Sequence, residues 1–125
     1  MKLWIFVGLG SFLGGVARYA TARAVHAWLP AAAFPLGTFV ANVAGCFLIG
    51  ALSGVFERGG VADPALRLFL TVGFCGGFTT FSTFANENLH LLQGRAFLLA
   101  ALYAGASLAC GLAAAWGGHW LARAV

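Results

Sequence analysis

Residues 73–84 read GFCGGFTTFSTF and form the densest signal in the 125-residue chain. Paired glycines followed by paired threonines make a poor continuous helix, because each glycine costs a helix about 1 kcal/mol. The stretch lies in an apolar run long enough to cross a bilayer, and it carries no charged residue. We therefore predict a membrane-spanning helix that is broken near its middle, with backbone carbonyl groups freed at the break.

The composition of the whole chain is that of an integral membrane protein. Hydrophobic residues make up 62% of the chain and charged residues only 8%, whereas a soluble domain has about 25% charged residues. The hydrophobicity excludes a disordered protein, and three cysteines set in separate apolar runs do not indicate a disulfide scaffold. Three acids and seven bases give a net charge of +4, but the bases are scattered, so nucleic-acid binding is not indicated.

Four apolar segments have the length of about 20 residues that a bilayer-crossing helix needs. We place these spans at about residues 3–24, 36–56, 66–86 and 96–116. Residues 1–125 are therefore predicted to form a single four-helix transmembrane domain, with consecutive helices antiparallel and both termini on one side. The alternative at the N-terminus is a signal peptide cleaved after Ala22, which is disfavoured because Arg18 would separate its apolar core from the cut.

The basic residues give the chain almost no preferred orientation in the membrane. The side of the termini would carry four bases and the opposite side three, namely Lys2, Arg58, Arg67 and Arg123 against Arg18, Arg23 and Arg95. Orientation follows the asymmetry of such charges, and here the asymmetry is slight. Two oppositely inserted copies would pair about a two-fold axis in the membrane plane. A monomer with one orientation is the alternative.

Polar side chains inside the other spans are candidates for an ion path. Thr38 and Asn42 are four residues apart, so they share one face of the second span. Asn42 either bonds a neighbouring helix or lines a water or ion path. Tyr103 and Ser107 repeat this spacing on the fourth span. Arg18, near the end of the first span, either reaches toward the interface or raises the anion concentration at a pore mouth.

Two glycine pairs, Gly10–Gly14 and Gly50–Gly54, have GxxxG spacing, which predicts close packing of helix backbones. Nothing in the sequence indicates an enzyme. We expect Glu57, Asp63 and Glu87 at span ends or in loops, so they form no carboxylate pair. The cysteines stand on three different spans and the histidines near span ends, so their spacing does not indicate zinc.

Three motifs resemble those of a known family. Residues 14–19 (GGVARY), 37–45 (GTFVANVAG) and 73–84 are similar to the motifs of the Fluc (CrcB-type) fluoride channels of microbes. The resemblance covers the whole chain, including its length and its four spans. It implies an all-α integral membrane protein with a broken third helix that forms an antiparallel, dual-topology homodimer in the bacterial inner membrane. It also implies two separate pores per dimer, through which fluoride leaves the cell passively.

The resemblance, together with the polar spacing, assigns residues to this function. It implies a structural sodium ion at the dimer centre, held by the backbone carbonyls of Gly76 and Thr79. The family's fourth-span polar track can carry a further hydroxyl where this chain has Gly111, and Glu87 matches an acidic position after the third-span motif. We assign nine side chains to the fluoride pore: Asn42, Phe81, Phe84, Ser82, Thr83, Tyr103, Ser107, Arg18 and Thr38.

Two other classes of membrane protein share some of these features. A small dual-topology multidrug exporter has similar size, span count and weak orientation bias. It needs a membrane-embedded carboxylate to exchange protons for cationic drugs, and the first span here holds Arg18 and no acid. A non-transporting scaffold held by GxxxG contacts does not account for a broken, hydroxyl-rich third span. We therefore expect a channel for which fluoride, a second copy of the chain and the lipid bilayer are the partners.

Overall fold

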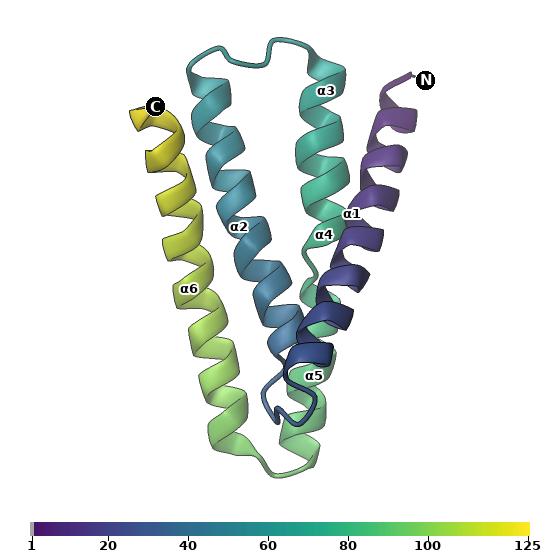
Figure 1. The fold of residues 1–125 in the computed structure, drawn as a ribbon, viewed down its shortest axis with the longest axis vertical. Helices are drawn as coiled ribbons and strands as arrows, with labels where there is room; N and C mark the ends of the chain where they lie inside the picture. The colour runs from purple at the N-terminus through teal and green to yellow at the C-terminus, as the bar shows by residue number, and fades with distance from the viewer. Residues whose placement is uncertain (1) are drawn as a thin grey trace.

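Helices account for nearly all of the chain in the computed structural model, which describes residues 2–125 (Figure 1). The elements are α1 (Lys2–Trp28), α2 (Leu36–Glu57), α3 (Pro64–Leu68), the π-helical segment η1 (Phe69–Cys75), α4 (Gly76–Phe78), α5 (Phe81–Gln93) and α6 (Phe97–Ala124). Four crossings are long and apolar enough to span a membrane, and the third consists of α3, η1, α4 and α5 together. The two termini lie at one end of the bundle, as predicted.

The helices extend further than the apolar runs from which we predicted them. The first continues past residue 24 to Trp28, the third past residue 86 to Gln93, and the fourth past residue 116 to Ala124. Polar residues such as Arg23 and His119 interrupt the apolar runs, but a polar side chain that reaches the membrane–water interface does not end a helix. Hydropathy therefore marks the membrane-embedded part of each crossing and underestimates the length of the helix.

The third crossing is broken, as predicted, but the break lies beyond the paired glycines. Gly76 and Gly77 are helical in α4, and the chain becomes extended at Thr79 (ψ 155°) and Thr80 (φ −150°, ψ 121°). The helix α5 starts after Thr80, whose side chain accepts a hydrogen bond of 3.2 Å from the Thr83 N–H. Threonine is a favoured N-cap residue, so the second threonine of the pair, rather than a glycine, fixes the break.

The glycines of the third crossing instead serve its packing on α1. A Cβ added at Gly73 would lie 2.9 Å from the Cα of Gly10, and one added at Gly77 would lie 3.0 Å from the Cα of Ser11. A larger residue at these positions would push the two backbones apart. The Gly10–Gly14 pair thus packs α1 closely against η1 and α4, which confirms the role predicted from its spacing.

The second glycine pair, Gly50–Gly54, packs α2 against α6. A Cβ added at Gly50 would lie 2.8 Å from the Cα of Ala115, and one added at Gly118 would lie 3.0 Å from the backbone nitrogen of Ala51. The bundle therefore consists of two close pairs, α1 with the third crossing and α2 with α6. Among residues 2–125, α1 makes no contact with α6, and α1 meets α2 along one seam.

Two neighbouring glycines of α6 give a direct test of this packing. A Cβ at Gly118 would meet the α2 backbone, whereas a Cβ at Gly117 would have no atom within 4 Å among the described residues, apart from its chain neighbours and the nearby backbone of α6. Gly118→Ala should therefore destabilise the protein by about 1–3 kcal/mol, the usual cost of overpacking, and Gly117→Ala should not destabilise it. Thermal unfolding of both variants in detergent measures the difference, and equal losses would contradict the close approach of α2 and α6.

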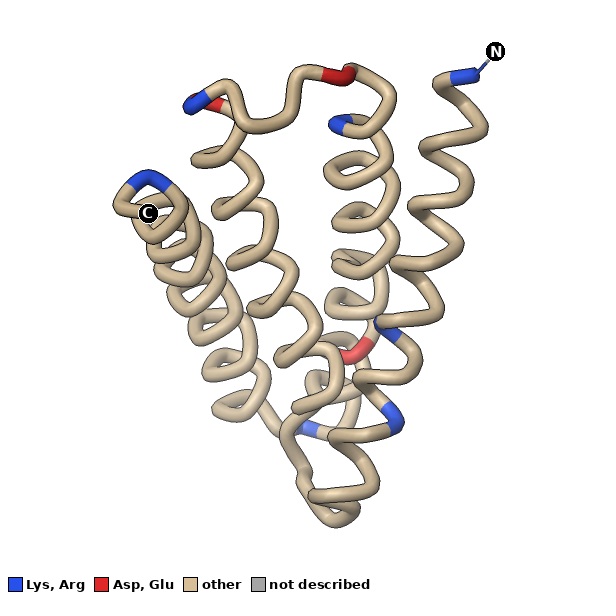
Figure 2. Tube along the Cα trace, turned by 45° about the horizontal axis from the view of Figure 1, so that its top comes forward, with Lys and Arg blue, Asp and Glu red and all other residues tan. Residues whose placement is uncertain are grey.

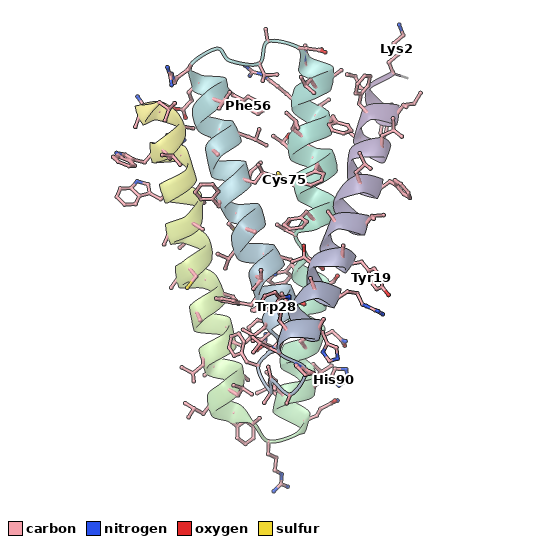
Figure 3. The ribbon with its side chains drawn as sticks, viewed as in Figure 1. Lys2, Tyr19, Trp28, Phe56, Cys75 and His90 are labelled. Carbon is pink, nitrogen blue, oxygen red and sulfur yellow. The ribbon has the colours of Figure 1, made fainter. Side chains whose placement is uncertain are left out.

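The outer surface of the bundle is that of a multi-pass membrane protein. Large apolar side chains are exposed along all four crossings. Exposed tryptophans lie near both ends, with Trp4, Trp116 and Trp120 toward the termini and Trp28 at the opposite end. Tryptophan is enriched at both membrane–water interfaces. Figure 2 shows that most charged residues lie toward the two ends of the bundle, and Figure 3 shows Lys2 and Trp28 at opposite ends of α1.

Candidate functional site

A groove of about 470 Å³ lies between α2, the broken third crossing and α6. Cys75, which lines it, stands near the middle of the bundle (Figure 3). The groove holds amide, hydroxyl, thiol and phenyl groups, and no charged side chain lines it within residues 2–125. Its lining consists of Asn42, Gly45, Cys46, Ile49, Thr71, Cys75, Gly76, Thr79, Thr80, Phe81, Phe84, Ala104, Ser107 and Leu108.

Asn42 ties α2 to the break. Its Oδ1 accepts a hydrogen bond of 2.8 Å from the Thr80 N–H, and its Nδ2 donates one of 3.1 Å to the Thr80 carbonyl. Of the two roles predicted for Asn42, the structure shows the bond to a neighbouring helix, and it also places the side chain on the wall of the groove. An amide has two N–H donors, so one remains after the bond to Thr80.

The break leaves backbone carbonyls without helical partners. In a continuous helix the Gly76 carbonyl would accept from the Thr80 N–H, and the Thr79 carbonyl from the Thr83 N–H. Here the side chains of Asn42 and Thr80 take those two N–H groups. No hydrogen bond to the Gly76 or Thr79 carbonyl forms in the part of the chain that the structure describes. These are the two carbonyls to which the resemblance assigns a sodium ion.

Arg18 reaches the same region from α1. Its Nε donates a hydrogen bond of 3.2 Å to the Gly77 carbonyl, which the break also frees. The guanidinium is partly buried at this contact and does not line the groove. The structure therefore shows Arg18 bound to the backbone of the third crossing, a partner that neither of the two roles predicted from the sequence included.

The hydroxyl groups after the break gather around Thr80. Thr80 Oγ1 donates to Thr83 Oγ1 at 3.1 Å and lies 3.4 Å from Ser82 Oγ. Ser82 and Thr83 do not line the groove, whereas Thr79 and Thr80 do. Reasoning from the sequence missed Thr80. A threonine between a helix-breaking stretch and a new polar-periodic run is an N-cap signal, and that signal would have found it.

Aromatic rings line one side of the groove. Phe81 and Phe84 have ring centroids 5.7 Å apart and tilted by 40°, and Phe84 meets Tyr103 edge-on at 5.0 Å. Phe34, in the loop before α2, packs edge-on against Tyr103 from another side at 5.1 Å. Tyr103 is fully buried, but the Phe81 side chain is 80% exposed in one copy of the chain. This row of rings thus extends from the buried Tyr103 through Phe84 to the exposed Phe81.

Glu87 lies inside α5 and not at a span end, which corrects our expectation for this acid. Its carboxylate accepts hydrogen bonds from the Thr38 hydroxyl and, at 3.0 Å, from the Tyr103 hydroxyl. The expectation was wrong because α5 continues to Gln93, beyond the end of the apolar run. Thr38 and Glu87 line a separate cavity of about 320 Å³ near the α1–α2 loop.

One buried polar group on the fourth crossing lacks a hydrogen-bond partner among the described residues. Ser107 Oγ is buried and has no hydrogen-bond partner among the described residues, although Ser107 lines the groove. One turn further, a Cβ added at Gly111 would lie 3.4 Å from Cys46 Sγ. The position at which the resemblance implies a further hydroxyl is therefore beside a thiol of α2.

The structure brings together most of the predicted site, but not all of it. Six of the predicted residues line the groove: Asn42, Gly76, Thr79, Phe81, Phe84 and Ser107. Tyr103 joins them through Phe84 and joins Thr38 through Glu87. Arg18, Ser82 and Thr83 lie beside the break and outside the groove.

Comparison with known proteins places the chain in a family. The family model described as CrcB-like protein, Camphor Resistance (CrcB), matches residues 5–119. The protein named fluoride-specific ion channel FluC of Flavobacterium psychrophilum is 44% identical over 123 residues, which cover 98% of each chain. Proteins of the same name from Nitratidesulfovibrio vulgaris (45%, all of both chains) and Chlorobaculum tepidum (46%, 98% of this chain and 96% of the relative) are equally similar. The chain therefore belongs to the CrcB-like family.

Proposed function

We propose that this protein is a passive, fluoride-selective channel and not an enzyme. The observation that carries the proposal is the groove, which offers hydrogen-bond donors and ring edges to an ion without a charged side chain. Relatives that align over nearly the whole chain are named as fluoride-specific ion channels, which supports the same function. The broken third crossing supplies the irregular backbone that membrane proteins tolerate only in buried or cavity-lining positions.

The chemistry of the groove suits a small, strongly hydrated anion. Fluoride gives up its water only where other donors replace it, and the free Ser107 hydroxyl and the second Asn42 N–H are such donors. The edges of the Phe81 and Phe84 rings carry partial positive charge. These groups bind an anion weakly enough for it to leave, whereas a lysine or arginine in the groove would hold it.

A second, inverted copy of the chain would complete the path. A groove lined by amide and hydroxyl groups is not stable against lipid, and Phe81 projects from it with 80% of its side chain exposed. Another copy packed on this face would cover both. The nearly balanced bases, four on one side and three on the other, favour insertion in both orientations. The pair would then hold two grooves, and fluoride would cross each one down its gradient.

A structural sodium ion at the centre of the pair fits the orphaned carbonyls. The Gly76 and Thr79 carbonyls have no hydrogen-bond partner within residues 2–125, and carbonyl oxygens are suitable ligands for sodium. Two copies would supply four such oxygens. When bound, the ion would neutralise these carbonyl dipoles and hold the two breaks together, while Asn42 and Thr80 keep the helical N–H partners of the carbonyls occupied.

Replacing sodium with a larger monovalent cation should therefore weaken the dimer. Purified protein in sodium should run as a dimer in detergent, and the dimer fraction should fall when N-methylglucamine replaces all sodium. Returning sodium should restore it. A dimer equally stable in both cations would contradict the sodium assignment, while leaving the fluoride path untouched.

Fluoride efflux from liposomes tests the proposed function directly. Purified protein should release fluoride when valinomycin balances the charge, without a proton gradient or nucleotide, and should not release chloride under the same conditions. A fluoride electrode and a chloride electrode measure the two. A multidrug exporter would instead exchange protons for a cationic drug such as ethidium and release no fluoride. A scaffold would do neither.

A further inference from the structure

A second cavity, of about 500 Å³, lies at the end of the molecule that carries the termini. It opens between α2, α3 and η1, and its lining consists of Ile49, Ser53, Phe56, Glu57, Arg67 and Thr71. Ile49 and Thr71 also line the groove beside Asn42. The two spaces therefore adjoin, and the outer cavity is the approach to the groove from this end of the bundle.

Arg67 carries an unneutralised positive charge on the wall of this cavity. Its Nε donates a hydrogen bond to the Val61 carbonyl, and its guanidinium lies over the Phe56 ring, 4.7 Å from the centroid. A carbonyl and a phenyl face hold the side chain in place without cancelling its charge. Within residues 2–125, Arg67 forms no ion pair with an acid.

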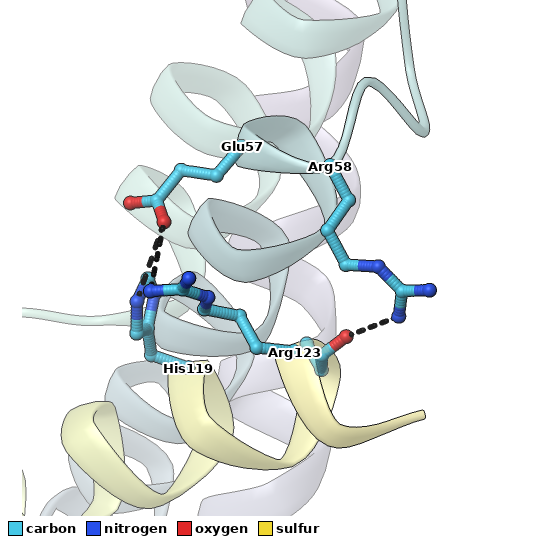
Figure 4. A network of polar contacts seen from close by, with 5 residues as sticks. Glu57, Arg58, His119 and Arg123 are labelled. Atoms are coloured by element: carbon cyan, nitrogen blue, oxygen red, sulfur yellow. Dashed lines mark hydrogen bonds and ion pairs between the residues drawn. The ribbon is translucent and has the colours of Figure 1, made fainter.

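Glu57, the acid on the opposite wall, is occupied by other partners. Its Oε2 lies 3.8 Å from Arg123 Nη1 and 3.5 Å from His119 Nε2, both on α6 (Figure 4). Arg123 thus cancels much of the negative potential that Glu57 would otherwise impose on the cavity. The charge that the cavity presents to an approaching ion is therefore positive, and it comes from Arg67.

We propose that this cavity is an anion-collecting entrance in which Arg67 concentrates hydrated halide-class anions before they reach the uncharged groove, while Arg123 masks Glu57. The inference deepens the proposed function and rests on it. A fixed charge at a cavity wall raises the local concentration of counter-ions and the rate at which they enter. Because Arg67 stands outside the groove, it attracts the anion without trapping it on the path.

Removing the charge of Arg67 should slow fluoride entry in a salt-dependent way. At about 0.01 M salt, where the Debye length is about 30 Å, Arg67→Gln should lower the initial efflux rate about 3-fold. At about 1 M of an impermeant salt, where the Debye length is about 3 Å, the variant and wild type should converge. Arg67→Lys keeps the charge and should retain most of the low-salt rate.

Arg58→Gln is the matched control for this experiment. Arg58 lies at the same end of the bundle, but its Nη1 donates to the Ala122 carbonyl at 3.0 Å and it does not line the cavity (Figure 4). The substitution removes the same charge from the protein and should change the low-salt rate much less than Arg67→Gln. Equal effects of the two variants would show a general charge effect and overturn the assignment to Arg67.

The masking of Glu57 is tested by a double substitution. Arg123→Gln should expose the Glu57 charge and lower the low-salt rate about 2-fold, and Glu57→Gln in the same chain should restore it. Failure of Glu57→Gln to restore the rate would overturn the masking role.

The two proposals fail in different ways. If wild-type protein releases no fluoride, the proposed function is wrong. If wild type releases fluoride but Arg67→Gln releases it at the same rate at low salt, the proposed role of Arg67 is wrong and the proposed channel function is not affected. The same conclusion follows if the two proteins differ by the same factor at low and high salt. A variant that no longer folds is recognised by its elution profile in detergent. Arg67→Met, which keeps a long side chain over the Phe56 ring but removes the charge, then replaces Arg67→Gln in the comparison with Arg67→Lys.

Discussion

Asn42→Ala should reduce fluoride efflux by at least about 100-fold. The Asn42 amide holds both the N–H and the carbonyl of Thr80, and a buried backbone group left without its partner costs about 1–3 kcal/mol. Without this clamp the Thr80 N–H returns to the Gly76 carbonyl and the break tends to close. The substitution also removes an ion-facing donor. Efflux from liposomes, normalised to correctly folded protein, measures the loss.

Two further variants make this result specific. Asn88→Ala is the control, because within residues 2–125 the Asn88 amide bonds only the Phe84 carbonyl of its own helix, at 3.0 Å, and its loss should leave most of the efflux. Asn42→Asp keeps an acceptor for the Thr80 N–H but replaces the donor with a negative charge. It should fold and still conduct poorly. Near-normal efflux through Asn42→Asp would contradict a role for the amide as an anion donor.

Phe81→Ile should lower fluoride efflux by at least about 10-fold while leaving the fold intact. The Phe81 side chain is 80% exposed in one copy of the chain, so its loss removes little packing from that copy. It does remove a ring edge from the groove, and an aliphatic side chain carries no such positive rim. Efflux from liposomes, together with thermal stability in detergent, separates the two effects.

The same substitution at Phe12 is the control for Phe81. The Phe12 side chain is 67% exposed on α1 and does not line the groove. Phe12→Ile should therefore leave fluoride efflux near the wild-type rate. If Phe81→Ile behaves in the same way, the aromatic row is packing alone and the proposed path is wrong at this point.

Much of the fold follows from the sequence by simple arguments. Bilayer thickness and the near absence of charge define the four crossings, and GxxxG spacing identifies the faces on which Gly10–Gly14 and Gly50–Gly54 pack. The existence of a break follows from a glycine-rich and threonine-rich run in a membrane helix. These features depend on neighbouring residues or on a regular period, so a single sequence carries them.

The position of the break and the environment of Glu87 do not follow in this way. The Thr80 N-cap marks where α5 begins, but the Thr80 N–H is kept from the preceding helix by Asn42, which bonds it from 38 residues away, and no local pattern encodes that competition for the backbone N–H. Glu87 meets Thr38 and Tyr103 from two other helices. Its place depends on how the crossings are packed and on how far α5 continues beyond the apolar run.

The family motifs predicted that several residues belong to one site. The spacing of polar residues alone did not predict which contacts these residues make. Asn42, Phe84 and Ser107 lie on one groove, whereas Arg18 binds the Gly77 carbonyl and Ser82 joins the Thr80 cap. A spacing of four residues places side chains on one face of a helix. It does not say which face meets the groove, because that depends on glycine contacts between helices far apart in sequence.

The reversal potential of single channels in a planar bilayer tests the central claim most directly. With unequal fluoride and equal chloride on the two sides, we expect currents that reverse at the fluoride equilibrium potential and stay there when the chloride or proton concentration is changed. Currents that follow chloride or protons, or a protein that is folded and silent in fluoride, would contradict a fluoride path through the groove at the break.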